Sequence, residues 1–302
     1  MVGTIKLKKG WYIKMTYRTQ KKLLLGTFLL LPLMLMGLFF IYPFLRLFYM
    51  SFTDWDGIMP QYSFVGIDNY IEVFRTPDVW ISLRNNVIYI VNGVLQNIIA
   101  LLFAVLLTSK TRARNFYKAS IFLPFIINSA AVAFMFTFIF DFERGPVNAV
   151  ITALGAKPVS FLGNVSIVNF SLAGISLWRY TGYTMILYIA AFQSINPDLY
   201  ESSMIDGAGA WQNFIYITLP EIKTIVELNL FLTLSGGLQA FVEPFIVTKG
   251  GPVNASNTFV LYTINAFTQF NRYGFAAALS VILLVIVLIL SGVQKKLIFR
   301  GD

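Results

Sequence analysis

Six long apolar stretches recur along the chain, and polar or turn-rich segments separate them. Each stretch approaches the length of about 20 residues that a helix needs to cross the hydrocarbon core of a bilayer. We expect the six spans at residues 23–45, 86–107, 119–140, 168–190, 225–247 and 273–290. The first run is longer than the apolar region of a signal peptide and has no small-residue cleavage site, so it is expected to stay in the membrane. The pattern therefore predicts an all-α membrane protein with six transmembrane helices.

The amino-acid composition also indicates a membrane protein, and it limits which catalytic and metal-binding groups the chain can offer. Of the 302 residues, 57% are hydrophobic and 12% are charged, whereas a soluble domain carries about 25% charged residues. The sequence has no cysteine and no histidine, which excludes disulfides and removes the commonest general base and metal ligand. An intramembrane enzyme would therefore have little chemistry available. We expect no metal or other cofactor bound by this chain, and the net charge of +9 is no sign of nucleic-acid binding.

The distribution of lysine and arginine predicts which side of the membrane each loop faces, because cytoplasmic loops carry the excess of these residues. With a cytoplasmic N-terminus, fifteen of the 23 lysine and arginine residues fall inside and six fall in outside segments. The segment after the first span is acidic and aromatic instead. Six spans with both termini cytoplasmic fit this distribution, and the loop between the fourth and fifth spans is then cytoplasmic.

On this topology the chain divides into three parts. Residues 1–22 form a basic, aromatic cytoplasmic tail that suits anionic lipid headgroups. Residues 23–295 form a single six-helix transmembrane domain, and residues 296–302 form a short cytoplasmic tail. No long linker, low-complexity segment or internal repeat is evident.

One cytoplasmic segment, residues 200–220, is polar and punctuated by glycine in a chain that is mostly membrane. Glu201 and Asp206 lie close together, Gly207 follows at once, and a short apolar-periodic run ends at Pro220. Alternating helix-forming and helix-breaking residues predict two short helices that meet at a bend near Gly207. One interpretation is a docking element for another protein, since lipid contact does not explain the exposed acids. The other is an amphipathic hairpin at the membrane surface, in which Glu201 is merely solvated.

The same segment resembles a family motif. The run E-S-S-x-x-D-G-A, followed by an aromatic residue and I-x-L-P, is similar to the coupling loop of ABC importer permeases, usually written E-A-A-x-x-x-G. Serine replaces both alanines of the motif and is small enough to keep close packing. The bend would let the loop sit as a rigid knob in a cleft of an ATPase subunit. The resemblance implies ATPase coupling for Glu201, Ser202, Ser203, Asp206, Gly207, Ala208, Phe214, Leu219 and Pro220.

Other stretches resemble the carbohydrate-uptake (maltose-type) branch of these permeases. The segment V-T-K-G-G-P at 247–252 is similar to an outside loop of that branch, and the chain resembles the first (MalF/UgpA-like) permease of the pair. The resemblance implies a bacterial-type cell membrane, a second (MalG-like) permease subunit and an extracytoplasmic sugar-binding protein. It also implies two ATPase subunits that bind ATP and Mg. Independently, the sequence lacks the G-x-x-x-x-G-K-[ST] phosphate loop, so this chain is not expected to be an enzyme.

Polar residues within the spans are candidates for a substrate path, because a charge in lipid costs about 2.5–3.5 kcal/mol on insertion scales. Candidates in the second, fourth and fifth spans are Asn92, Gln96, Arg179, Tyr183, Ser235, Gln239 and Glu243. Amide, carboxylate and aromatic groups together suit a sugar, which offers hydroxyls around patches of C–H. The other interpretation is helix–helix packing, a common role of polar residues in membranes. Arg179 is expected either to pair with Glu243 or to extend to the outer surface.

Two classes of transporter compete for the function. The leading hypothesis is a permease subunit of an ATP-driven ABC importer, which forms the path for a sugar or oligosaccharide. The alternative is an ion-gradient-driven secondary transporter. That class predicts paired acids at mid-membrane and broken-helix repeats, and the spans lack both patterns.

Overall fold

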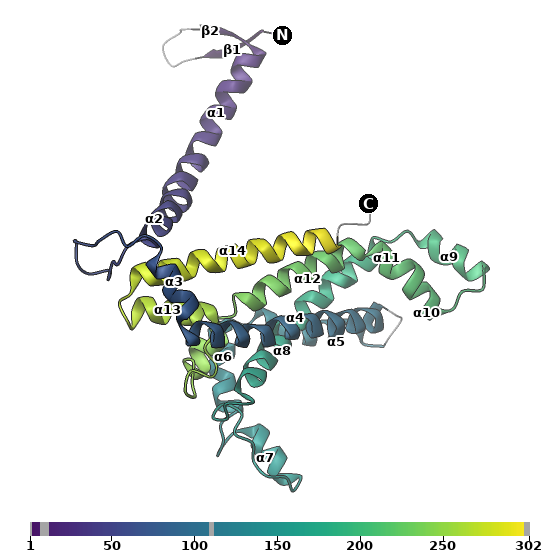
Figure 1. The fold of residues 1–302 in the computed structure, drawn as a ribbon. Helices are drawn as coiled ribbons and strands as arrows, with labels where there is room; N and C mark the ends of the chain where they lie inside the picture. Colours follow the sequence, from purple (N-terminus) through teal and green to yellow (C-terminus); the bar gives the residue numbers. More distant parts are fainter. Residues whose placement is uncertain (1, 7–11, 109–111, 299–302) are drawn as a thin grey trace.

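The fold is helical throughout the membrane domain (Figure 1). The computed structural model describes residues 2–6, 12–108 and 112–298, so the predicted cytoplasmic residues Lys8, Lys9, Lys110 and Arg300 lie outside the described residues. The elements in chain order are β1 Val2–Lys6, β2 Tyr12–Thr16, α1 Tyr17–Met36, η1 Gly37–Ile41, α2 Tyr42–Met50, α3 Asp68–Arg75, α4 Pro77–Thr108, α5 Arg114–Ile126, α6 Ser129–Ile139, α7 Pro146–Ala153, α8 Val168–Gln193, α9 Pro197–Ile205, α10 Ala210–Asn213, η2 Phe214–Thr218, α11 Leu219–Glu221, α12 Lys223–Leu238, η3 Pro244–Thr248, α13 Phe259–Thr268 and α14 Tyr273–Ile298. The prediction of a helical membrane protein is confirmed at this level.

A short β-hairpin precedes the first helix and corrects the all-α prediction. Strands β1 and β2 pair antiparallel, with Val2 opposite Thr16 and Lys6 opposite Tyr12. Helix α1 follows directly and begins at Tyr17, ahead of the predicted start of the first span. The segment contains β-branched and aromatic residues, which favour strands, but hydropathy and charge alone do not register that preference.

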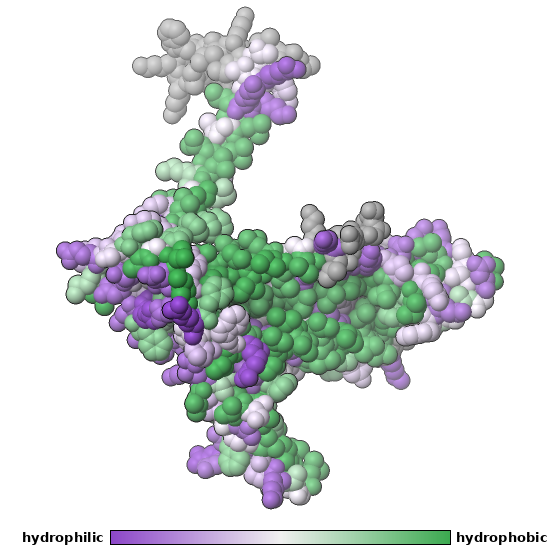
Figure 2. All heavy atoms as spheres, viewed as in Figure 1, coloured by the Kyte–Doolittle hydropathy of each residue, from purple (hydrophilic) through white to green (hydrophobic). Residues whose placement is uncertain are grey.

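Three helices within the described residues are long and apolar enough to cross a membrane on their own: Tyr17–Met50, Pro77–Thr108 and Tyr273–Gln294. The first of these joins α1, the π-helical turn η1 and α2, and none of its described residues is buried. It projects away from the body that the other helices form (Figure 1). Hydrophobic residues cover the middle of that body and α1, and hydrophilic residues gather at the two ends of the body (Figure 2). Helix α8 is long enough, with 26 residues, but its middle is more polar.

Two of the predicted spans are interrupted. In the third, α5 and α6 are separated by two residues and meet at an angle of 98°. Asn128 caps α6, since its Oδ1 accepts a hydrogen bond from Ala130 N at 2.9 Å. In the fifth, α12 ends at Leu238, and helical structure resumes just before η3. Hydropathy predicted single spans here because it does not register a cap or a change of backbone hydrogen-bond partner.

Helix α4 forms the centre of the body and packs against α8 and α12. Helix α5 packs on α8, while α3 and α13 pack on α14. The helices approach closely where glycine removes the side chain: a Cβ on Gly182 of α8 would lie 2.0 Å from Ile121 O of α5. Helices α9–α11, the C-terminal end of α4 and that of α14 share one end of the body, and α3 and α13 lie at the other (Figure 1).

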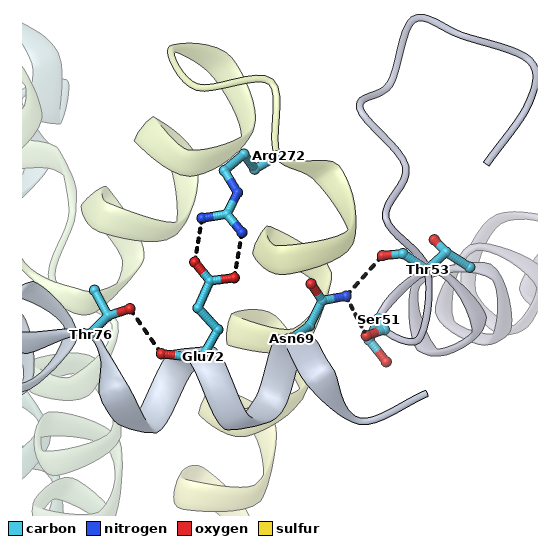
Figure 3. Close-up of polar contacts among 6 residues, drawn as sticks. All are labelled: Ser51, Thr53, Asn69, Glu72, Thr76 and Arg272. Carbon is cyan, nitrogen blue, oxygen red and sulfur yellow. Dashed lines mark hydrogen bonds and ion pairs between the residues drawn. The ribbon is translucent and has the colours of Figure 1, made fainter. Parts of the chain in front are cut away.

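At the end that carries α3, polar side chains fasten three segments together (Figure 3). The Arg272 guanidinium donates two hydrogen bonds to the Glu72 carboxylate, one from Nη1 to Oε1 at 2.6 Å. Asn69 donates from Nδ2 to Ser51 O at 3.0 Å and to Thr53 O at 2.8 Å. Helix α3 therefore joins the end of the first helical run to the start of α14.

This junction predicts a pH dependence. The Arg272 guanidinium, through its hydrogen bonds, holds the pKa of Glu72 below its usual range. Such a carboxylate stabilises the fold above its unfolded pKa of about 4.3 and loses that contribution as the pH falls through the lower folded pKa. We expect Glu72→Gln to lower the Tm in detergent slightly at pH 7, because exposed ion pairs contribute only about 0–1 kcal/mol. The difference from the wild type should vanish well below about pH 4 in thermal unfolding.

The exposed Glu143 offers a matched control, because its carboxylate forms no hydrogen bond or ion pair with any described residue. Glu143→Gln should leave the Tm unchanged at every pH. A Tm difference for Glu72→Gln that persists unchanged at low pH would contradict the role of the ion pair.

Candidate functional site

The segment predicted to couple to an ATPase is a pair of short helices with a sharp turn between them. Asn196 begins α9, since its Oδ1 accepts from Asp198 N at 3.1 Å. The helix ends where Gly207 adopts a φ of +80°, a conformation that favours glycine. Ala208 N donates to Ser203 O at 2.9 Å, and Gly207 N donates to Met204 O at 3.1 Å. This Schellman pattern satisfies the last carbonyls of α9 and lies at the predicted bend.

The second half of the segment runs back to the membrane domain as one helical stretch. Gln212 Oε1 accepts from Gly209 N at 2.8 Å, which starts α10, and η2 and α11 continue it. The Tyr200 and Thr218 hydroxyls share a hydrogen bond of 2.8 Å between the two halves. Tyr200 and Ile217 also pack on a buried cluster that includes Tyr188 of α8 and Ala104 of α4. The two short helices are therefore packed rigidly against the membrane helices α4 and α8. We call residues 197–221 the coupling segment.

The predicted coupling residues all belong to the coupling segment, and most face solvent. Glu201, Ser202, Asp206, Gly207 and Pro220 are exposed, while Ser203, Ala208, Phe214 and Leu219 are half-buried. The hydroxyls that replace the alanines of the motif donate to their own helix, Ser202 to Asp198 O and Ser203 to Tyr200 O. The carboxylate of Glu201 forms no hydrogen bond or ion pair with any described residue.

Besides its acids, the coupling segment exposes several large apolar side chains. Ile205 is 87% exposed, and Met204, Trp211 and Tyr216 are also well exposed. Large exposed apolar side chains outside the membrane are candidates for contact with a partner protein. Hydropathy could not find them, because whether a side chain near a turn faces outward depends on the path of the turn.

The predicted substrate-path residues gather around a cavity of about 940 Å³ between α4, α8, α12 and the segment after α12. Six of the seven candidates line it: Asn92, Gln96, Tyr183, Ser235, Gln239 and Glu243. Arg179 does not. Its guanidinium donates to the Tyr180 hydroxyl at 2.7 Å and to Ile127 O at 3.4 Å. No ion pair joins Arg179 and Glu243 among the described residues.

The cavity wall combines aromatic faces with polar groups. Phe125 and Tyr183 stack with ring centres 4.5 Å apart. The Tyr89 and Ser235 hydroxyls are buried without a hydrogen-bond partner among the described residues, and Glu243 is 7% exposed. Gln96 is partly engaged in packing, since its Nε2 donates to Thr184 Oγ1 at 2.9 Å. The sequence pattern missed the ring of Phe125, because Phe125 lies in the third predicted span and the candidates came from the second, fourth and fifth spans.

The cavity has a single charged side chain in its wall, Glu243. Within the part of the chain that the structure describes, no group of three or more acidic side chains gathers to hold a metal ion. The wall can therefore offer amide and hydroxyl hydrogen bonds and aromatic contact surface.

Comparison with known proteins identifies the family. Residues 96–300, more than half of the chain, match the family model described as binding-protein-dependent transport system inner membrane component. The probable ABC transporter permease protein YurN of Bacillus subtilis is 33% identical over 278 residues, which cover 90% of this chain and 95% of that protein. The trehalose/maltose transport system permease protein MalF of Thermococcus litoralis is 30% identical over 292 residues, 96% of this chain and 98% of that protein.

A solved structure has the same fold. The bacterial alginate ABC transporter, solved in complex with an alginate pentasaccharide-bound periplasmic protein, contains a chain that matches with a TM-score of 0.80 at 24% identity, covering 95% of this chain and 99% of that chain. With the family match and the near full-length relatives, the assignment is plain. This chain belongs to the binding-protein-dependent transport system inner membrane components, the multi-pass permease subunits of ABC transporters.

Proposed function

We propose that this chain forms, with a second permease, the path through which an ATP-driven importer carries a sugar or oligosaccharide. The observation that carries the proposal is the polar and aromatic wall of the cavity. Relatives of near full length support it, since they include permeases named for trehalose/maltose and for lactose, the latter 32% identical over 267 residues. Aromatic faces suit the C–H patches of a sugar ring, while amides and hydroxyls suit its hydroxyl groups. A cavity whose sole charge is one carboxylate favours an uncharged saccharide.

The proposed topology has six spans and cytoplasmic termini. The spans are the α1–α2 run, α4, the bent pair α5 and α6, α8, α12 with the segment that follows it, and α14. Three described regions next to or within predicted cytoplasmic segments support this sidedness because they lie at one end of the body: the C-terminal end of α4, the coupling segment and the end of α14 (Figure 1). The bend of 98° and the early end of α12 are compatible with spans, since broken helices are tolerated where protein surrounds the backbone.

The coupling segment is the proposed route by which ATP hydrolysis in partner subunits moves the membrane helices. Its exposed apolar side chains, Ile205 and Trp211 among them, would enter a cleft of an ATPase subunit, and Glu201 would face basic or N–H partners there. Two ATPase subunits would bind ATP and Mg, since this chain has no phosphate loop. Because the coupling segment packs on α4 and α8, its displacement would move those helices as a rigid body.

The proposed supplier of substrate is an extracytoplasmic binding protein at the other end of the body. The related alginate transporter was solved with a periplasmic protein that carries its pentasaccharide. On the proposed topology, the extracytoplasmic end of this chain carries α3 and α13 (Figure 1).

Reconstitution in liposomes tests the proposal against the alternative. The test uses a sugar that the binding protein binds. Liposomes with the complete set of permeases, ATPases and binding protein should take up this sugar only when ATP is supplied to the ATPase side. An ionophore should have no effect. Uptake that persists without the ATPase subunits and collapses with an ionophore would instead establish an ion-gradient-driven secondary transporter.

A further inference from the structure

Helix α12 ends inside the body, where its last carbonyls have no partner within the helix. A side chain from another helix donates hydrogen bonds to them instead. Asn86 of α4 is fully buried and donates from Nδ2 to Gly237 O at 2.8 Å and to Leu238 O at 3.0 Å. Its Oδ1 accepts from Phe259 N, the first residue of α13, at 2.8 Å. One carboxamide therefore satisfies three backbone groups from two elements that are separated in the chain.

The segment between these two elements is fastened to the same place. The neighbouring Asn85 donates from Nδ2 to Ala255 O at 2.9 Å and to Asn257 O at 2.8 Å. Thr258 Oγ1 donates to Ala240 O at 2.6 Å, which closes the segment on itself. Residues 237–259, which we call the wall segment, are thus tied to α4 at both ends.

The wall segment also forms part of the cavity. Its residues 237 and 239–243 line the cavity, and the side chains of Gln239, Phe241 and Glu243 come from backbone at or beyond the end of α12. Helix α4 lies directly behind, because a Cβ on Gly237 would be 2.9 Å from Ile90 N. Outside a regular helix, backbone position depends on such external hydrogen bonds, since a buried carbonyl left without a partner costs about 1–3 kcal/mol.

We propose that Asn86 is a positioning residue for the cavity, which clamps the end of α12 and the start of α13 to α4. The wall segment then moves together with α4, and Gln239, Phe241 and Glu243 keep their places as the helices shift. The assignment of the cavity as the sugar path rests on the proposed function, whereas the clamp itself rests on the hydrogen bonds of Asn86.

A second asparagine on the same helix provides a matched control. Asn97 donates from Nδ2 to Thr233 Oγ1 at 2.9 Å and accepts from the Tyr188 hydroxyl. It therefore joins α4 to α12 and α8 without bonding to the end of α12 or to α13. Asn97→Leu should loosen only the packing of α4 on α12 and α8 around Thr233 and Tyr188, while loss of the clamp should follow only from Asn86→Leu.

Hydrogen–deuterium exchange with mass spectrometry on the complete transporter in nanodiscs tests the clamp, without nucleotide and with ATP, Mg and vanadate. In Asn86→Leu, amides of residues 239–259 should exchange about tenfold faster in both states, which corresponds to about 1.4 kcal/mol. Peptides of the coupling segment should be unchanged, and ATP hydrolysis should stay at the wild-type level. In Asn97→Leu, residues 239–259 should remain as protected as in the wild type.

Wild-type protection of residues 239–259 in Asn86→Leu, or equal loosening in both variants, would overturn the clamp. If Asn86→Leu does not assemble, Asn86→Ala replaces it, because this smaller side chain also removes both the donor and the acceptor. Residues 239–243 and the Phe259 amide should then both exchange faster, and faster exchange of only one of them or of neither would again overturn the proposal. None of these readouts uses a sugar, so failure of the proposed function in liposomes would be seen separately.

Discussion

Replacing Gly207 with proline is expected to leave the transporter assembled in the membrane and to reduce ATP-driven uptake strongly. Gly207 turns the chain with a φ of +80°, whereas proline fixes φ near about −65°. Proline also removes the N–H that donates to Met204 O. The two halves of the coupling segment would then meet at a different angle, so that the exposed Ile205 and Trp211 would no longer fit one cleft. The membrane helices should be unaffected, because Gly207 itself is exposed.

The measurement compares uptake and substrate-stimulated ATP hydrolysis in reconstituted complexes. Uptake should fall by about tenfold or more in Gly207→Pro, the change that a loss of about 1.4 kcal/mol in docking produces. Glu201→Lys should behave similarly, because it reverses the charge offered to the ATPase. Gly209→Ala is the control: its φ of −78° suits alanine, and the nearest atom to a new Cβ is 3.8 Å away. Normal stimulated hydrolysis in both Gly207→Pro and Glu201→Lys would show that the docking role is wrongly placed.

Replacing Gly182 with alanine is expected to disrupt the membrane domain itself. The added Cβ would lie 2.0 Å from Ile121 O and 2.7 Å from Phe122 Cα, both backbone atoms of α5. A backbone cannot rotate away as a side chain can, so α5 and α8 would have to separate. Overpacking of a filled interior costs about 1–3 kcal/mol, and this contact lies at the upper end of that range or beyond it.

The amount and the Tm of purified complex measure this effect. Gly182→Ala should give much less assembled protein and a Tm lower by several degrees, at roughly 2–4 °C for each kcal/mol in a domain of this size. Gly174→Ala is the matched control on the same helix, since nothing lies within 4 Å of its added Cβ. If both variants match the wild type, α5 and α8 do not cross as closely as described.

Much of the helical framework could be predicted from the sequence, because long apolar runs and their charges report directly on burial in lipid. The bend at Gly207 was predictable too, since a glycine after a helical run usually marks a left-handed turn. The early end of α12 was not. Its last carbonyls accept hydrogen bonds from Asn86, which is more than 150 residues away in the chain. The local amino-acid composition cannot indicate such a distant partner.

The candidate sites likewise include residues whose role could be predicted from the sequence and residues whose role could not. Candidates for the cavity wall were found on separate spans, because polar residues stand out in an apolar sequence. Arg179 was selected by the same rule, yet it bonds to Tyr180 and the backbone of Ile127 and does not line the cavity. Polarity in a span indicates that a partner exists, but only the fold shows whether that partner is a ligand or a neighbouring helix.

The apolar surface of the coupling segment also bears on how the transporter is made. Until an ATPase subunit covers them, Ile205, Met204, Trp211 and Tyr216 stand exposed to the cytoplasm on the proposed topology. Exposed apolar surface is an aggregation liability, and cells triage incompletely folded chains with chaperones and proteases. A permease chain that is synthesised without its ATPase would thus carry its own signal for removal. If the coupling segment docks an ATPase subunit as proposed, these side chains would also help to keep the numbers of the two subunits in balance.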